Sequence, residues 1–374
     1  MRRLTLGLVL FGLTCTHALA FEPWTLAERG NRGYKQPSIQ WIEGATINEV
    51  ENGTLNYALP AFEGDPLWDP LNAKPITPDT KYGEAVQYGY QLIVATWRHI
   101  GPEVEDVNMR YAGNNNACSS CHLGAGTMQY SAPFVGTYGN FPQYRNREDV
   151  LGTLTSRING CMERSMNGYK LPPESNEMKA MQAYMHWLSQ GIPVGASKIK
   201  GRGLKLVNRP MIRNNTADVE NGAKVYEAQC AVCHGENGQG EKRLDANGKF
   251  DGYTNPALWG TDDTYNTGAG MYRTLKAADF IYSTMPKGAT GDAPILTDKE
   301  AYDVAAFINQ DAHYRPVKIN RNVDFGDPKV RVPDQDVMGY YGKNGELMFP
   351  DEGMERMRYK VGPYKGIIKQ KPAN

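Results

Sequence analysis

Hydrophobic residues recur at helical spacing in four stretches of the chain, and these stretches form two pairs. Residues 82–99 and 177–189 make the first pair, and residues 219–229 and 298–309 make the second. Apolar side chains at positions i, i+3 and i+4 share one face of a helix, which packs on a core. The closing stretches carry their apolar stripes at Met181, Tyr184, Met185 and Leu188, and at Tyr302, Ala305, Ala306 and Phe307. The pattern predicts a mainly α protein with an internal repeat.

A fifth amphipathic stretch, residues 146–167, lies between the two members of the first pair. Asn146 predicts the start of a helix, because a short polar side chain caps free backbone N–H groups and Asp149 suits the first turn. The dipeptide Asn167-Gly168 predicts its end. The apolar stripe of this predicted helix consists of Leu151, Leu154, Ile158 and Met162.

A polar stripe runs beside the apolar one on the same predicted helix. Arg157, Cys161 and Ser165 follow one another at a spacing of four residues, so they share a face. Arg147, ten residues before Arg157, lies near that side as well. Arginine recognises anions with several oxygens, and a thiol beside it is a nucleophile. We therefore predict an anion site with sulfur chemistry on this face.

Two copies of the pattern Cys-x-x-Cys-His occupy residues 118–122 and 230–234. The pattern is typical of c-type haem attachment, in which two thiols bind the porphyrin and the histidine ligates the iron. A zinc site made of two Cys-x-x-Cys pairs normally places them about 15–20 residues apart, far closer than here. The predicted cofactors are therefore two covalently bound haem c groups. Their attachment residues are Cys118, Cys121 and His122, and Cys230, Cys233 and His234.

The surroundings of the two motifs are alike. Each follows the first helix of a pair and precedes a glycine-rich loop, a proline beside apolar residues, and the closing helix. Such a unit resembles the mono-haem cytochrome c fold. We predict two cytochrome c-like domains, at residues 81–195 and 214–313, joined by a linker at 196–213. Residues 21–80 and 314–374 show little periodicity and are predicted to form long irregular N- and C-terminal extensions.

The first twenty residues have the pattern of a secretory signal. Arg2 and Arg3 precede an apolar run at residues 4–13, and Ala18-Leu19-Ala20 provides a cleavage site. We expect cleavage after Ala20 and a periplasmic protein. No apolar run reaches the roughly 18 residues that a membrane helix needs, so no membrane span is predicted.

Charge and glycine patterns exclude two other classes of function. The chain has 41 Lys and Arg against 41 Asp and Glu, whereas a nucleic-acid binder normally has a basic excess. The glycines at 235, 238 and 240 follow the haem histidine rather than a predicted strand. A nucleotide-binding loop is therefore not expected there.

Of the six cysteines, Cys15 lies in the predicted signal and four belong to the haem motifs, which leaves Cys161. Beside Arg157 and iron its thiol is expected to be a thiolate, because cations and metal coordination lower a thiol's pKa. Three alternatives stay open: Cys161 as an inert buried thiol, Arg157 as the partner of a haem propionate, and Ser165 as a surface hydroxyl.

Each six-coordinate haem needs a second axial ligand. For the second haem the candidate is Met285, with Met271 as its rival. For the first haem no similar Met-Pro loop exists, and the candidates are Cys161, Met128, Met162, Met166 and His186. His99 and His313 are expected to be structural.

These residues resemble one family in particular, the exported dihaem c-type thiosulfate dehydrogenases, which interconvert thiosulfate and tetrathionate. The resemblance rests on the two haem motifs, on residues 157–168 around Cys161, and on Met285-Pro286. It implies His122 and Cys161 as axial ligands of a catalytic haem, and His234 and Met285 as ligands of an electron-transfer haem. It also implies that Arg147, Arg157 and Ser165 line the anion site.

The implied reaction is 2 thiosulfate ⇌ tetrathionate + 2 electrons. Cys161 would leave the iron and form a sulfur–sulfur bond with one thiosulfate, and a second thiosulfate would attack that adduct. A soluble or membrane-linked cytochrome is the expected electron partner. In some family members a lysine precedes the distal methionine, whereas Thr284 stands there in this chain, and Lys287 is out of register.

Two other functions compete with this one. The first is a haem subunit of another thiosulfate-oxidising complex, which needs a partner chain for activity. The second is a dihaem electron carrier that is not an enzyme. Turnover of thiosulfate or tetrathionate by the protein alone distinguishes the enzyme from both.

Overall fold

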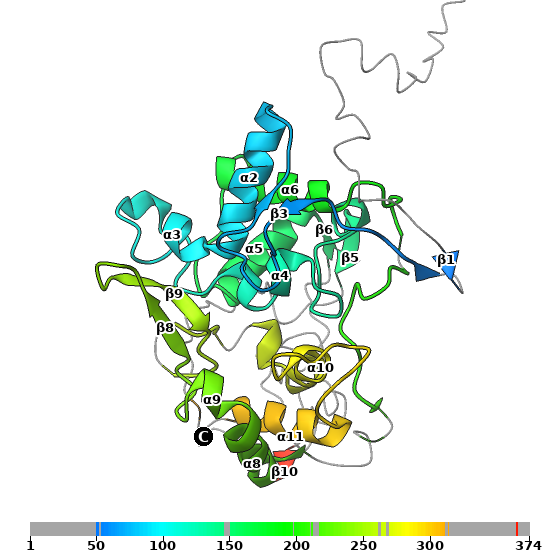
Figure 1. Ribbon diagram of the computed structural model, residues 1–374, viewed down its shortest axis with the longest axis vertical. Coiled ribbons are helices and arrows are strands. Elements are labelled where there is room, and N and C mark those ends of the chain that lie inside the picture. Colours follow the sequence, from blue (N-terminus) through cyan, green and yellow to red (C-terminus); the bar gives the residue numbers. More distant parts are fainter. Residues whose placement is uncertain are drawn as a thin grey trace, which may run out of the picture. The chain divides into compact units, whose positions relative to one another are not determined.

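The computed structural model describes residues 50–51, 54–145, 150–196, 198–209, 211, 217–260, 263–266, 269–310, 313 and 364–365. The chain divides into two compact units, Met1–Gln40 and Trp41–Asn374, and all elements described here belong to the second. Most of these elements are helices, and the strands form short two-stranded pairs (Figure 1). Within the described ranges, no helix has the length and apolarity needed to cross a membrane.

The first helix group holds the haem motif at residues 118–122. Its α-helices are α2 (Lys81–Val94), α3 (Thr96–Ile100), α4 (Leu123–Gly126), α5 (Leu154–Arg164) and α6 (Asn176–Leu188). Its short 3-10 helices are η2 (Val107–Met109), η3 (Cys118–Ser120) and η4 (Tyr138–Asn140). The side chains of Thr80 and Ser175 cap α2 and α6 by accepting from backbone N–H groups of the first turn.

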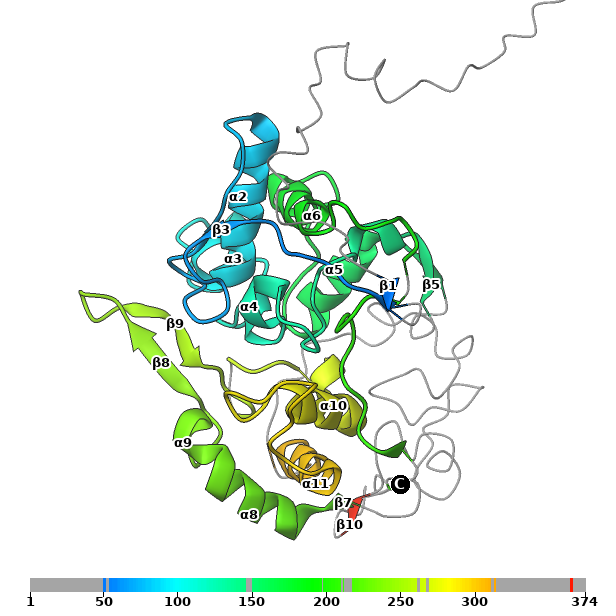
Figure 2. The same cartoon turned by 45° about the vertical axis from the view of Figure 1, so that its right-hand side comes forward.

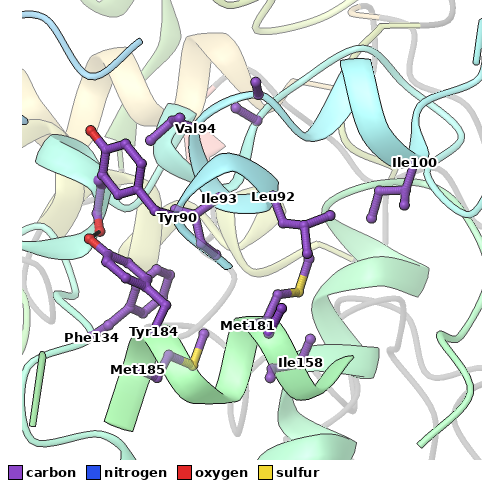
Figure 3. Packing of buried hydrophobic residues seen from close by; sticks show 14 of the residues in the cluster. Tyr90, Leu92, Ile93, Val94, Ile100, Phe134, Ile158, Met181, Tyr184 and Met185 are labelled. Atoms are coloured by element: carbon purple, nitrogen blue, oxygen red, sulfur yellow. Dashed lines mark hydrogen bonds between the residues drawn. The ribbon is translucent and has the colours of Figure 1, made fainter. Parts of the chain in front are cut away.

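The core of this group lies between α2, α5 and α6. Figure 3 shows buried side chains of these helices converging, and Tyr90 and Tyr184 meet edge to face with ring centroids 5.5 Å apart. Gly89 lets α2 and α6 approach closely, because a Cβ atom there would lie 2.0 Å from the carbonyl oxygen of Ala180. A glycine at this crossing is therefore a requirement of packing.

The second helix group holds the motif at residues 230–234 and has a core of its own. It contains α8 (Val219–Gln229), α9 (Ala231–His234), η5 (Gly270–Tyr272), α10 (Thr274–Thr284) and α11 (Asp298–Ile308). Its helix crossing repeats that of the first group: a Cβ atom at Gly222 of α8 would lie 2.2 Å from the carbonyl oxygen of Asp303 in α11. Figure 2 shows α11 between α8 and α10, and α11 packs against both.

The strands pair locally. Antiparallel pairs join β1 (Val50–Glu51) to β2 (Thr54–Leu55), β3 (Phe62–Glu63) to β4 (Lys74–Pro75), β5 (Gln143–Arg145) to β6 (Val150–Gly152), and β8 (Glu241–Leu244) to β9 (Phe250–Asn255). One parallel pair joins β7 (Ala217–Asp218) to β10 (Tyr364–Lys365).

The predicted helices agree with these elements except for a break inside the first and a later start of the fifth. Residues 82–99 form two helices, because Ala95 breaks the helical backbone. The predicted start of the fifth helix at Asn146 is wrong: β6 precedes α5, and Thr153 caps α5 by accepting from the N–H of Ser156. Leu151 is accordingly 71% exposed and does not belong to the core stripe.

Candidate functional site

A cavity of about 600 Å³ is lined by residues of both Cys-x-x-Cys-His motifs. Cys121 and His122 line it from the first helix group, and Cys233 and His234 line it from the second. Side chains of α5 and the Met285 loop line it as well. The cysteines and histidines of both motifs thus line the same cavity.

The two histidines are oriented in the same way. His122 Nδ1 lies 2.6 Å from the carbonyl oxygen of Ala132, and His234 Nδ1 lies 2.8 Å from that of Pro256. A carbonyl oxygen can only accept, so each Nδ1 carries the hydrogen and each Nε2 is the ring nitrogen left for a metal. Both rings therefore fit the role of a metal ligand held by a backbone hydrogen bond.

A glycine packs closely against an aromatic ring in the loop after each motif. The N–H of Phe134 donates to the carbonyl of Gly126 at 2.8 Å, and the N–H of Leu258 donates to that of Gly238, also at 2.8 Å. A Cβ atom at Gly126 would collide with the Phe134 ring, and one at Gly238 would collide with the Trp259 ring. The internal repeat thus extends to the contacts around each motif, and the residues present fit two haem c groups.

The thiols of the first motif and the thiol of Cys161 differ in charge. Burial raises the pKa of Cys118 to about 11 and that of Cys121 to about 12. Burial also opposes ionisation of Cys161, yet Arg157, His122 and Arg164 lower its pKa to about 5. These cationic neighbours therefore favour the thiolate form of Cys161.

The predicted polar stripe on α5 faces the cavity. Arg157 Nη1 donates to Cys161 Sγ at 2.6 Å, one helical turn apart, and Ser165 caps the C-terminal end of the helix. Arg157, Cys161 and Ser165 all line the cavity. Arg147 lies outside the described residues, so its relation to this site stays a prediction.

The Met285 loop follows α10 directly. Met285 is the C-terminal cap residue of α10, packs against the core of the second helix group and lines the cavity. Its rival Met271 lines the cavity too. The Thr284 hydroxyl is buried and donates to the carbonyl of Phe280 at 2.7 Å, and Lys287 places Nζ 5.1 Å from the ring centroid of Trp68.

The remaining candidate ligands of the first haem divide into two sets. Met128, Met162 and Met166 line the cavity. His186 lies elsewhere, where its Nδ1 is 2.5 Å from the hydroxyl of Tyr82. His99 and His313 pack against aromatic rings, at Tyr88 and Trp259.

Three further residues that line the cavity are not among the site residues predicted from the sequence. Arg202 of the predicted linker, Arg243 of β8 and Trp97 of α3 all line the space. Nothing local in the sequence marks Arg202 or Trp97. The dipeptide Asn247-Gly248 is a hairpin signal that points to the β8–β9 pair, and through it to Arg243.

Comparison with known proteins identifies both haem regions. Residues 106–194 match the family described as SoxA/TsdA, cytochrome c domain, and residues 219–311 match cytochrome c. The chain is 40% identical over 249 residues to a thiosulfate dehydrogenase of Allochromatium vinosum, covering 66% of this chain and 83% of that protein. The chain belongs to the thiosulfate dehydrogenase family.

Two other relatives agree with this assignment. A thiosulfate dehydrogenase of Psychrobacter arcticus is 39% identical over 248 residues, covering 66% of this chain and 68% of that one. The solved thiosulfate dehydrogenase TsdBA from Marichromatium purpuratum, in its as-isolated form, matches with 31% identity and a TM-score of 0.54. That match covers 67% of this chain and 53% of the other, so the chain spans about half the length of that structure.

Membership confirms the predicted family, the mainly α fold with two cytochrome c domains, and the two covalently bound haem c groups. The protein is an oxidoreductase that acts on thiosulfate. The two regions of sequence match each contain one Cys-x-x-Cys-His motif, which accounts for one haem each.

Proposed function

We propose that the protein catalyses 2 thiosulfate ⇌ tetrathionate + 2 electrons at the α5 face that carries Cys161. In this proposal His122 and Cys161 ligate the catalytic haem, and His234 and Met285 ligate the electron-transfer haem. The hydrogen bond from Arg157 Nη1 to Cys161 Sγ, at 2.6 Å, is the observation that carries it. It supports a sulfur nucleophile and an anion-binding cation at one place.

The charged groups around Cys161 explain why it suits this role. A thiolate is the nucleophilic form of cysteine, and the cationic neighbours of Cys161 lower its pKa to about 5 against the effect of burial, which favours that form. Arg157 can also bind the oxygens of a sulfonate group. Ser165 and Arg147 complete the proposed anion site, the latter from the sequence resemblance.

In the proposed reaction, a sulfur–sulfur bond first forms with release of two electrons and is then exchanged by a second thiosulfate. The Cys161 sulfur and the outer sulfur of one thiosulfate form a sulfur–sulfur bond, which releases two electrons. A second thiosulfate attacks the thiosulfate-derived sulfur and expels the Cys161 thiolate, so that tetrathionate leaves. Each haem c, when bound, supplies an iron that accepts one electron. In the opposite direction, Cys161 attacks tetrathionate and releases thiosulfate.

Location and electron partner complete the proposal. We propose that residues 1–20 are removed after export to the periplasm, and that a soluble or membrane-linked cytochrome exchanges electrons with the Met285 haem. We also keep the predicted domain limits, 81–195 and 214–313, as part of this proposal.

The test is a steady-state assay of the purified holoprotein in both directions. Thiosulfate with an artificial electron acceptor, and tetrathionate with an artificial donor, are expected to turn over without any partner chain. Absence of turnover in both directions would contradict the proposal and favour an electron carrier. Turnover only after addition of a second protein would favour a subunit of a larger complex.

A further inference from the structure

Trp97 of the first helix group packs against the β8–β9 hairpin of the second. Gly252 of β9 has φ 87° and approaches so closely that a Cβ atom there would lie 2.5 Å from Cζ2 of the ring. Arg243 of β8 places its guanidinium 5.5 Å from the ring centroid. The hairpin therefore contacts this one ring through its backbone and through a cation.

A salt bridge lies next to the ring. Arg98 donates from Nε to Asp251 Oδ1 at 2.8 Å and from Nη2 to Oδ2 at 2.7 Å. Burial favours the neutral form of Asp251, yet Arg98 and Arg243 hold the pKa of its carboxyl below the usual value. A bidentate pair of this kind fixes orientation, although its partial exposure limits its contribution to stability.

Both ends of this contact reach a haem motif. Thr96, the neighbour of Trp97, accepts through its hydroxyl oxygen from the N–H of Cys118 at 3.2 Å. At the other end, β9 runs directly into Pro256, whose carbonyl holds His234 Nδ1 at 2.8 Å. A continuous series of contacts thus joins the attachment cysteine of one haem to the histidine of the other.

We propose that Trp97 and the β8–β9 hairpin are a positioning contact, which holds the two haem attachment sites at the geometry required for electron transfer between them. The inference rests on the proposed function only in that electrons pass between the haems. Gly252 itself does not line the cavity, so displacing the hairpin at this residue acts on the transfer rate rather than on thiosulfate affinity. A separate contact outside the hairpin, from Asn116 Nδ2 to the carbonyl of Asp263 at 2.5 Å, also joins the two helix groups.

Two glycines of the hairpin provide a matched pair of variants. Gly248 has φ 75°, close to that of Gly252, but a Cβ atom at Gly248 would meet nothing within 4 Å. Gly252→Ala and Gly248→Ala therefore add similar backbone strain, and only the first pushes the hairpin off Trp97. Internal electron transfer is measured on the holoprotein after photochemical reduction by one electron equivalent, without thiosulfate.

Gly252→Ala is expected to slow internal transfer about tenfold, because small displacements of reacting groups cost large factors in rate. Gly248→Ala is expected to match wild type, and both variants are expected to keep the wild-type KM for thiosulfate. Equal transfer rates in the two variants would overturn the proposal. Because no thiosulfate is present, a protein that failed to turn over thiosulfate would still decide this question.

The salt bridge gives a second test on the protein surface. Arg98→Gln is expected to slow internal transfer several-fold, and Arg98→Lys to restore part of the rate, since lysine keeps the charge but loses the bidentate geometry. The absorption spectra of both haems are expected to stay unchanged. If Arg98→Gln and Gly252→Ala both transfer electrons between the haems at the wild-type rate, the contact has no role in that transfer.

Discussion

The two helix groups are built on the same frame and differ in the sulfur-bearing residue, Cys161 or Met285, that each presents to the cavity. In both, a glycine lets the first helix cross the last one, at Gly89 and at Gly222. In both, a backbone carbonyl orients the motif histidine, at Ala132 and at Pro256. These shared features concern only the binding of a haem, so the frame by itself explains no chemistry.

The difference lies in the element that carries the sulfur. In the first group, α5 presents Cys161, which accepts a hydrogen bond from Arg157. In the second, α10 ends at Met285, a neutral thioether on a loop. In the proposed function, this difference makes one copy of the scaffold the reactive centre and the other the electron relay, according to which sulfur each presents and how much positive charge surrounds it.

Loss of the reactive sulfur is expected to have the largest effect. Cys161→Gly is expected to abolish thiosulfate-dependent reduction of an acceptor, because it removes the nucleophile, and to leave the absorption of the Met285 haem intact. Ser156→Ala, at an exposed position of the same helix, is the control and is expected to keep full activity. Full activity of Cys161→Gly would remove the proposed distinction between the two groups.

Loss of the cation beside the thiolate is expected to come next. A hydrogen bond to a charged group contributes about 1.5–3 kcal/mol, which corresponds to about 10–150-fold in kcat/KM for Arg157→Gln. Arg157→Lys is expected to retain part of the activity because the charge remains. The control is Arg110→Gln at an exposed position of the same helix group, and wild-type kinetics in Arg157→Gln would contradict the role of this cation.

The shared frame makes a prediction about stability. Gly89→Ala and Gly222→Ala each place a Cβ atom against a backbone carbonyl, and overpacking of this kind costs about 1–3 kcal/mol in the free energy of unfolding. Gly203→Ala is the control, since a Cβ atom there would meet nothing within 4 Å. Denaturant unfolding of the holoprotein measures all three. If one crossing tolerates alanine as well as Gly203 does, the two frames are not equivalent.

The smallest effect is expected at Thr284, the residue before the proposed methionine ligand. Its hydroxyl bonds to the carbonyl of Phe280 inside α10, so Thr284→Val is expected to cost only about 1 kcal/mol of stability. The long-wavelength charge-transfer band of a methionine-ligated ferric haem is expected to persist. Disappearance of that band in Thr284→Val would show that Thr284 controls the ligand.

The sequence predicts the parts of this site that depend on short spacing. Two Cys-x-x-Cys-His motifs define both haems, and the four-residue step from Arg157 to Cys161 is enough to place the two side chains on one helix face. Helix ends are harder to predict from the sequence. The predicted helix begins at Asn146, but residues of that stretch form β6, which pairs with β5, and α5 is capped by Thr153. Trp97 and Arg202 line the cavity because of tertiary packing. Local sequence patterns do not predict such contacts.

The central claim is that Cys161 is a thiolate ligand at the first haem, and electron paramagnetic resonance of the oxidised protein tests it most directly. We expect two low-spin ferric signals in wild type, one of the histidine–thiolate type and one of the histidine–methionine type. In Cys161→Gly the first signal is expected to disappear and the second to remain. A histidine–thiolate signal that persists in Cys161→Gly, or is absent from wild type, would contradict the account.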